Sequence, residues 1–215
     1  SDFFLLFLRR IYWYMSKKKV FLLITMLLFT VTLLAANHKF TLVIDAGHGG
    51  HDDGMKINEF SEKEIVASIA KKIKKNNTNS NIIIHLTRTE DRFISLQDRV
   101  KYINNIKPNL VLSLHVNGNK NKEASGVELY ISPKNTMYET SKKIADDLNS
   151  RFITNHNLKS RGVKNASFML LKESEYPSIT LELGFLSNEN DRKYLTDQNE
   201  QEKIATTILE TISAL

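Results

Sequence analysis

The sequence contains no cysteine. This absence excludes disulfide bonds, a thiol nucleophile, a thiolate metal site and a lipidated N-terminal cysteine. A metal ion bound by this chain would therefore depend on histidine, aspartate and glutamate side chains. The lack of cysteine does not by itself fix the cellular compartment.

A concentrated stretch of positive charge is missing from most of the chain. The 215 residues carry a formal net charge of +6, but residues 1–36 hold five basic residues against one acidic residue. The rest of the chain has 25 basic and 23 acidic residues and is nearly neutral. Because it has no basic stripe interleaved with aromatic residues, we expect no nucleic acid among its partners.

The N-terminal extension has the pattern of an export signal. Met15 is followed by Ser-Lys-Lys-Lys, by a mainly apolar run at residues 20–34 and by two alanines. We predict either a signal peptide or an uncleaved membrane anchor over residues 1–36. The apolar run is short for a membrane span, and Leu34-Ala35-Ala36 is not a clean cleavage site.

Residues 1–14 are interpreted as upstream read-through, with Met15 as the natural start. Either form of the N-terminus would place residues 37–215 outside the cytoplasm. We therefore predict an exported globular domain in the periplasm or cell envelope.

The globular part alternates strand and helix patterns. Short apolar runs predict strands at residues 40–44, 82–86, 109–114, 126–132, 167–171 and 178–183. Amphipathic spacing predicts helices at residues 61–75, 96–107, 137–154, 188–195 and 200–215. Ser61 and Glu64 are spaced as a capping box, and residues 155–165 are predicted to be a polar loop. This alternation predicts an α/β fold in which helices cover both faces of a sheet.

Two histidines follow predicted strands. His48 lies in a glycine-rich loop after residues 40–44, with Asp45 at the end of the strand, and His115 directly follows residues 109–114. Glycine lets such a loop turn sharply and approach a ligand closely. His48 alone is equally explained by a solvated loop position, and His115 alone is more often a packed core residue. Two at equivalent strand ends favour a metal site.

Two glutamates complete the candidate set. Glu62 begins a predicted helix, where a surface acid that favours the helix dipole is the simpler explanation. Glu182 lies inside an apolar strand, where a carboxylate is costly unless it is paired, for example with Arg88, or bound to a cation. Arg88, Asp91 and Arg99 form either a salt-bridged cluster beside the site or a set of solvated charges.

Together these residues have the composition of a catalytic zinc site. Ligands bind outside the carboxyl ends of strands in open α/β sheets, where His48, His115 and Glu182 fall. Two imidazoles and one carboxylate hold zinc and leave a position for water, and a further carboxylate can deprotonate that water. The residues therefore point to hydrolysis by an activated water.

At these positions the sequence closely resembles the zinc-dependent N-acetylmuramoyl-L-alanine amidases over residues 40–215. The resemblance is carried, in the family's order, by residues 43–50 (Val-Ile-Asp-Ala-Gly-His-Gly-Gly), 62–63 (Glu-Lys), 87–88 (Thr-Arg), 113–117 (Ser-Leu-His-Val-Asn) and 181–188 (Leu-Glu-Leu-Gly-Phe-Leu-Ser-Asn). It implies a mixed sheet of about six strands in a catalytic domain at residues 37–215.

The resemblance also implies roles and partners. It makes His48, Glu62 and His115 the ligands of one zinc ion and Glu182 the catalytic carboxylate. The expected substrate is peptidoglycan, cut between N-acetylmuramic acid and L-alanine during cell-wall remodelling or daughter-cell separation. We expect a monomer, tethered to the membrane if the N-terminus is retained, with room for an activator protein. Four residues are expected to orient a ligand or contact substrate: Asp45, Arg88, Asn117 and Arg161. Asp45 is equally explained as the end of its strand.

Two further readings stay open. A zinc peptidase or deacetylase acting on the same polymer would use the same residues. A wall-binding module could keep the fold without turnover, although all four key positions are filled. Val116 and Gly118 depart from the family's usual small residues, and no long insertion interrupts residues 126–162. The sequence thus resembles a minimal form without a helix over the site.

Overall fold

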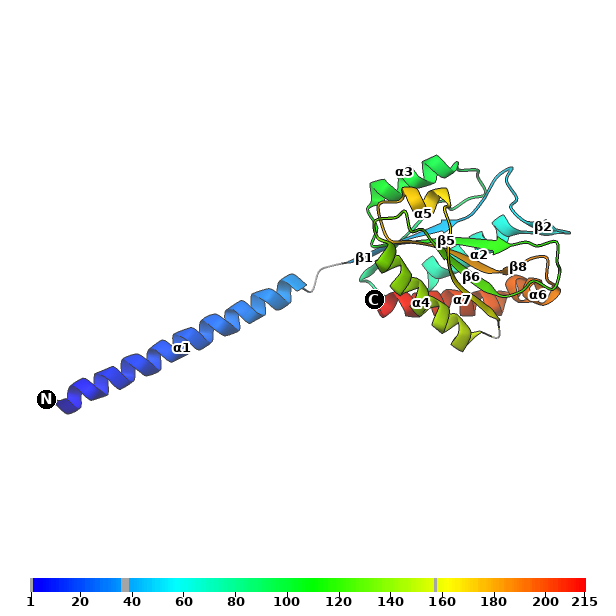
Figure 1. The fold of residues 1–215 in the computed structure, drawn as a ribbon. Helices are drawn as coiled ribbons and strands as arrows, with labels where there is room; N and C mark the ends of the chain where they lie inside the picture. The colour runs from blue at the N-terminus through cyan, green and yellow to red at the C-terminus, as the bar shows by residue number, and fades with distance from the viewer. Residues whose placement is uncertain (1, 36–38, 157) are drawn as a thin grey trace. The chain divides into compact units, whose positions relative to one another are not determined.

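The computed structural model describes residues 2–35, 39–156 and 158–215 (Figure 1). The chain divides into two compact units, Ser1–Lys39 and Phe40–Leu215. The first unit is helix α1, Asp2–Ala35. No helix among the described residues meets the length and hydropathy needed to cross a membrane. Ala36, part of the proposed cleavage region, lies outside the described residues.

The second unit is built on a six-stranded sheet of order β4-β1-β5-β8-β6-β7. The strands are β1 Phe40–Ala46, β4 Ile82–Leu86, β5 Leu110–Asn117, β6 Val127–Ile131, β7 Ser160–Asn165 and β8 Ser178–Phe185. The first four in this order are parallel, β6 runs antiparallel to β8, and β7 runs parallel to β6. The sheet is therefore mixed and six-stranded, as predicted.

Helices cover both faces of the sheet (Figure 1). One face carries α2 Glu62–Asn76, α4 Tyr138–Asn155 and α7 Gln198–Ser213. The other carries α3 Leu96–Ile106 and the short α5 Met169–Glu173, while α6 Glu189–Thr196 follows β8. A small hairpin, β2 Lys56–Ile57 and β3 Phe60–Ser61, leads into α2. The predicted helices are all present, with ends shifted by a few residues.

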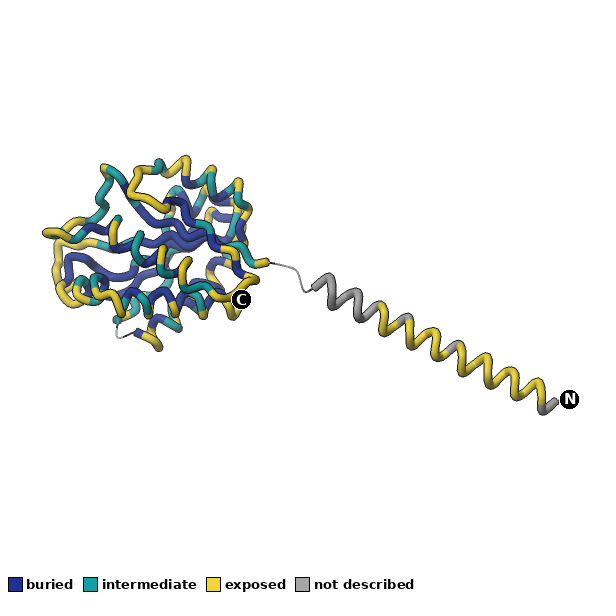
Figure 2. The backbone as a smooth tube through the Cα atoms, turned by 180° about the vertical axis from the view of Figure 1, so that it is seen from behind, coloured by how far each residue is buried: buried dark blue, intermediate teal, exposed yellow. Residues whose placement is uncertain are grey.

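The core follows from strands that are buried on both sides. Leu42, Val43 and Ile44 of β1 are all fully buried, as are Leu110, Val111 and Leu112 of β5. Figure 2 shows this buried layer running through the centre of the domain. Parallel strands with helices on both faces need such continuous apolar runs, because neither face meets water.

Two predicted elements are wrong. Residues 167–171 were expected to form a strand, but Met169–Glu173 is helix α5, with Leu170 and Leu171 buried. A short apolar run has the same appearance in a strand and in one turn of a buried helix. Residues 155–165, expected as a polar loop, contain β7. This strand is at the sheet edge and mostly only partly buried, so its sequence lacks an apolar signature.

Two boundaries also differ for physical reasons. Strand β5 continues past Leu114, so His115 lies within the strand. The capping box does not form: Ser61 donates its hydroxyl to Glu64 Oε2 at 2.8 Å and accepts no helix N–H. The first amides of α2 bond instead to loop carbonyls, Glu62 N to Met55 O at 2.8 Å and Lys63 N to Asp53 O at 3.3 Å. The loop itself therefore caps this helix.

Candidate metal centre

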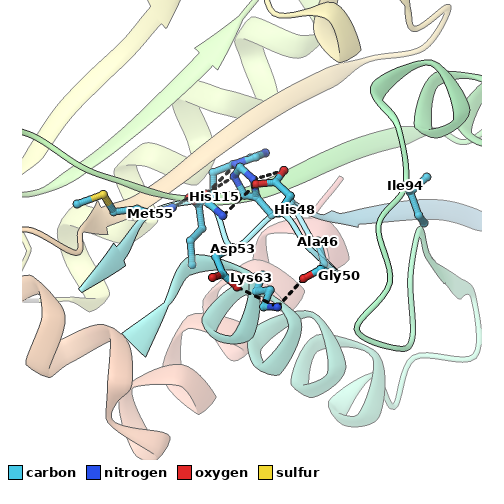
Figure 3. Close-up of polar contacts among 12 residues, drawn as sticks. Ala46, His48, Gly50, Asp53, Met55, Lys63, Ile94 and His115 are labelled. Carbon is cyan, nitrogen blue, oxygen red and sulfur yellow. Dashed lines mark hydrogen bonds and ion pairs between the residues drawn. The ribbon is translucent and has the colours of Figure 1, made fainter. Parts of the chain in front are cut away.

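Three predicted ligands converge from separate segments of the chain. Each of His48, Glu62 and His115 offers one ligand atom, and these atoms all lie within 4.8 Å of one another. Glu62 Oε1 is 3.1 Å from His48 Nε2 and 2.9 Å from His115 Nδ1. Figure 3 shows the two histidines side by side above the start of α2. The predicted gathering of these three residues is present.

Local backbone geometry puts the three candidate ligands in place. His48 adopts φ 59°, an uncommon left-handed conformation for a residue other than glycine. A Cβ added to Gly47 would lie 2.5 Å from the His115 ring, and one added to Gly54 would lie 2.4 Å from Glu62 Oε2. These two glycines therefore leave room for the ligand side chains and explain the glycine-rich sequence of this region.

Glu62 is fixed by hydrogen bonds on both oxygens. Oε1 accepts the Val116 N–H at 2.9 Å, and Oε2 accepts the Met55 N–H at 2.8 Å. Burial alone would raise the pKa of this carboxyl, but the two imidazoles outweigh it and hold its pKa well below the usual range. Glu62 is thus held as a carboxylate with one oxygen turned to the imidazoles.

The pKa values of the two imidazoles shift in the direction opposite to that of Glu62. Burial lowers the pKa of His48, but hydrogen bonds to Glu62 and Asp52 outweigh that effect and raise it to about 9. The pKa of His115 is also raised, because Glu62 outweighs burial. Positive charge is therefore stabilised between these three side chains. Two nitrogens and one carboxylate oxygen, gathered around favoured positive charge, fit a divalent cation such as zinc.

Asp52, which is not among the residues predicted for the site, supports His48. Its Oδ2 lies 2.8 Å from His48 Nδ1, leaving Nε2 turned toward Glu62. A carboxylate on the far nitrogen of a metal-binding imidazole fixes the ring's tautomer and direction. The four-residue spacing between His48 and Asp52 in a glycine-rich loop is the signal that could have identified it.

Asp45 does not make the imidazole contact that one of its two readings required. Its carboxylate binds Arg99 Nη1 at 2.6 Å, Ser113 Oγ at 2.6 Å and Thr87 Oγ1 at 2.8 Å. Burial raises the pKa of Asp45, but Arg99 and Ser113 outweigh it and lower the pKa overall. Asp45 is a buried anchor for Arg99.

Three cationic side chains hold the backbone of the His48 loop. Arg99 donates to Ala46 O at 2.8 Å and to His48 O at 2.6 Å. Arg88 donates to Ala46 O at 3.0 Å and to Gly47 O at 2.9 Å. Lys63 donates to Gly50 O at 2.7 Å, a contact visible in Figure 3. The loop carbonyls are therefore satisfied by fixed donors, which keeps His48 in its strained conformation.

Neither of the two readings left open for Arg88, Asp91 and Arg99 holds for all three: they form no salt-bridged cluster with one another, and Arg88 and Arg99 are buried rather than solvated. Arg99 pairs with Asp45, whereas Asp91 pairs with Lys63 at 3.0 Å. Among the described residues Arg88 has no ion pair and uses its guanidinium on backbone carbonyls. Arg88 is accordingly not the partner of Glu182.

Glu182 lies beside the cluster in a different environment. It is the β8 residue in register with His115 on one side and with Glu128 on the other. Its Oε2 is buried and has no hydrogen-bond partner among the described residues. Burial is the main reason that its pKa is raised to about 7. A buried oxygen without a partner is expensive, which indicates a site built for a ligand or for water.

Asn117 and Arg161 meet at Glu128 on the neighbouring strand. Glu128 accepts hydrogen bonds from Asn117 Nδ2 at 3.1 Å, Lys164 Nζ at 2.9 Å and Tyr130 Oη at 2.7 Å, and it also pairs with Arg161. Burial raises the pKa of Glu128, but these partners outweigh it and lower the pKa. A charged cross-strand row therefore extends from His115 through Glu182 to Glu128.

Three side chains that could hold one metal ion, beside a separate carboxyl group on a mixed α/β sheet, are an arrangement that suits a metallohydrolase domain. The family model of N-acetylmuramoyl-L-alanine amidases matches residues 42–214. The chain belongs to this family, which confirms the resemblance seen in its motifs.

Known proteins show the same similarity. N-acetylmuramoyl-L-alanine amidase LytC of Bacillus subtilis is 34% identical over 170 residues, covering 78% of this chain and 34% of LytC. This chain thus spans about a third of that relative's length.

Solved structures agree in fold. The N-acetylmuramoyl-L-alanine amidase of Clostridium difficile 630 is 31% identical with TM-score 0.78, covering 82% of this chain and 96% of that one. The CwlD amidase of Clostridioides difficile, solved in complex with the GerS lipoprotein, is 28% identical with TM-score 0.73 and covers 82% and 98%.

Proposed function

We propose that this chain is a zinc-dependent N-acetylmuramoyl-L-alanine amidase. It would hydrolyse the amide between the lactyl group of N-acetylmuramic acid and L-alanine in peptidoglycan. The observation that carries this proposal is the gathering of His48, Glu62 and His115 next to the unpartnered Oε2 of Glu182, in a chain of this family.

The metal would be held by His48 Nε2, Glu62 Oε1 and His115 Nδ1, one ion per chain. Zinc suits two imidazoles and one carboxylate in a chain without thiols. When bound, zinc supplies a Lewis acid for the amide carbonyl and makes a water molecule more acidic. Asp52 and the backbone donors to Glu62 keep the ligand atoms in position.

Glu182 would move the proton. Its carboxyl group accepts a proton from the attacking water and then returns it to the nitrogen of the leaving alanine, so that the amide C–N bond breaks to a carboxylic acid and an amine. The pKa of about 7 suits a group that must both accept and donate a proton near neutral pH. Glu62 cannot share this task, because its pKa is held low by the imidazoles.

Digestion of purified muropeptides tests the proposal. The expected products are a free peptide with an N-terminal L-alanine and a muramic acid that regains its lactyl carboxyl group. Treatment with a chelator should stop the reaction, and added zinc should restore it. Cleavage inside the stem peptide would identify a peptidase, released acetate a deacetylase, and binding without product a wall-binding module. Activity that persists without metal would contradict the metal mechanism.

A cell-envelope location accompanies this activity, because the polymer lies outside the cytoplasmic membrane. We propose export through residues 1–36, acting as a cleaved signal or as an anchor, and a monomeric catalytic domain. A protein activator is a further candidate partner, since the related CwlD amidase was solved with the GerS lipoprotein. Cell fractionation tests this: a product found only in the cytoplasm would contradict export.

A further inference from the structure

A cavity of about 300 Å³ beside the metal centre has two unlike walls. The chemical wall carries His48, His115 and Glu182. The apolar wall comes from the starts of the two helices on this face, with Leu96 of α3 and Phe168, Met169 and Leu170 at α5. Three further polar residues of the sheet strands complete the lining: Asp45, Ser113 and Thr180. Such a cavity suits a small group that is polar at one end and apolar at the other.

The apolar wall keeps large side chains in contact with solvent. Phe168 is 44% exposed and Leu96 is 52% exposed, although both line a cavity next to buried polar groups. Phe168 is also held in place, since its ring centroid lies 5.3 Å from that of Tyr130. An exposed aromatic ring that a neighbouring side chain already holds in place loses little further conformational freedom when it binds a ligand.

Phe168 and Leu96 lie on different sides of the site. Tyr130, the partner of Phe168, is in register with Thr180, two residues before Glu182 on β8. Phe168 therefore belongs to the Glu182 side of the cavity. Leu96 begins α3, whose Arg99 binds the carbonyl of His48, so Leu96 belongs to the His48 side.

The place of Glu182 in the cavity lining indicates which part of a substrate faces Phe168. Glu182 and Phe168 both line this cavity, and under the proposed mechanism the leaving nitrogen comes to the Glu182 carboxyl group. The carbon attached to that nitrogen, with its side chain, must then lie on the same side of the cavity. We propose that Phe168 forms the wall of a subsite for the side chain of the first amino acid of the leaving peptide, a methyl group in L-alanine.

This inference rests on the proposed function and goes further by naming the specificity-determining residue. A methyl group placed against an aromatic ring and removed from water gives discrimination of about 10-fold over hydrogen. Soluble N-acetylmuramoyl dipeptides with L-alanine or glycine in the first position therefore serve as matched substrates. The unmodified protein should cleave the alanine form with about 10-fold higher kcat/KM.

The test compares the alanine-to-glycine ratio of kcat/KM between variants. Phe168→Ala should lower this ratio to about 1–2 by reducing cleavage of the alanine substrate alone, and Phe168→Leu should retain most of it. Phe93→Ala is the matched control, because Phe93 is 48% exposed, has its ring centroid 4.3 Å from that of His51 and is not among the residues that line this cavity. Zinc content and thermal unfolding report whether each variant keeps its metal and fold.

The outcomes distinguish failure of the Phe168 subsite from failure of the proposed amidase function. If the zinc-loaded unmodified protein cleaves neither dipeptide nor peptidoglycan, the proposed function fails. If both dipeptides are cleaved and Phe168→Ala leaves the ratio unchanged, the function stands and the subsite is overturned. A ratio that falls equally in Phe93→Ala would also overturn it, since the effect would not belong to the cavity wall.

Discussion

Two glutamates at one site have opposite surroundings. On the side of the site formed by β1 and α2, Glu62 accepts bonds from two backbone amides and contacts both imidazoles. On the β8 side, Glu182 has a buried oxygen with no partner among the described residues. The pKa of Glu62 is lowered by its neighbours, whereas that of Glu182 is raised to about 7 by burial.

The contrast teaches how one residue type takes two roles. A carboxylate that is fully paired and permanently charged is suited to hold a cation. A carboxyl group that is poorly paired and has a pKa near 7 is suited to exchange a proton. The side of Glu62 is also rigid, because Arg88, Arg99 and Lys63 bind four carbonyls of the His48 loop, those of residues 46, 47, 48 and 50. Four experiments can break or sharpen this contrast.

The largest effect is expected from loss of a ligand. His115→Ala should abolish stoichiometric zinc binding and reduce activity by more than ~10⁴-fold, since it removes one of the three proposed ligands. Metal analysis after dialysis and a muropeptide assay measure the two effects. His85→Ala is the control, because His85 lies in β4 outside the gathered ligands. Full zinc retention by His115→Ala would contradict the ligand assignment.

Next in size is loss of the proton carrier. Glu182→Ala should keep one zinc per chain and lose ~10²–10⁴ in kcat, the usual contribution of a general base. The comparison with His115→Ala sharpens the division, since one change should remove metal and the other only turnover. If Glu182→Ala also released the metal, the roles given to the two sides would be wrong.

A smaller effect tests the rigid loop. Arg88→Lys replaces a planar fork that reaches Ala46 O, Gly47 O and Lys63 O with a single ammonium, which cannot reproduce that geometry. Zinc affinity, measured by competition with a chelating dye, should fall about 10–100-fold, as for other residues that orient metal ligands. Arg92→Lys, at an exposed position nearby, is the matched control. Unchanged affinity in Arg88→Lys would show that the loop holds its shape without this fork.

The smallest effect concerns stability and pH. Because the pKa of Glu182 is raised from 4.5 to about 7, the metal-free folded protein binds more protons than the unfolded chain between these values. Its stability should therefore fall as pH rises through this window, and the cost should be complete above about pH 7.

Glu182→Gln removes that cost. In chelator-treated protein the variant should be more stable than the unmodified chain by about 1–2 kcal/mol at pH 8, a discounted value for a partly exposed residue. The difference should shrink towards zero near pH 4.5. Urea unfolding at both pH values measures the difference in the free energy of unfolding. A difference that does not depend on pH would show that ionisation of Glu182 does not destabilise the folded protein.

Much of the fold could be predicted from local pattern. The apolar runs of β1, β4 and β8 and the four-residue isoleucine spacing of α2 and α7 are strong signals, because burial on a strand or helix face imposes them. Strand β7 and helix α5 were predicted wrongly because they lack such signals. An edge strand needs no apolar face, and a five-residue helix is too short to show a period.

The candidate site could likewise be predicted only in part. The sequence by itself determined which side chains were available: without cysteine, the ligands had to be histidines and acids, and glycines had to surround His48. Only the tertiary structure decided that Asp52 rather than Asp45 supports an imidazole, and that Glu182 lacks a partner. Hydrogen-bond partners, and the proton affinities they set, depend on distances between segments far apart in the chain, which no local pattern of residues encodes.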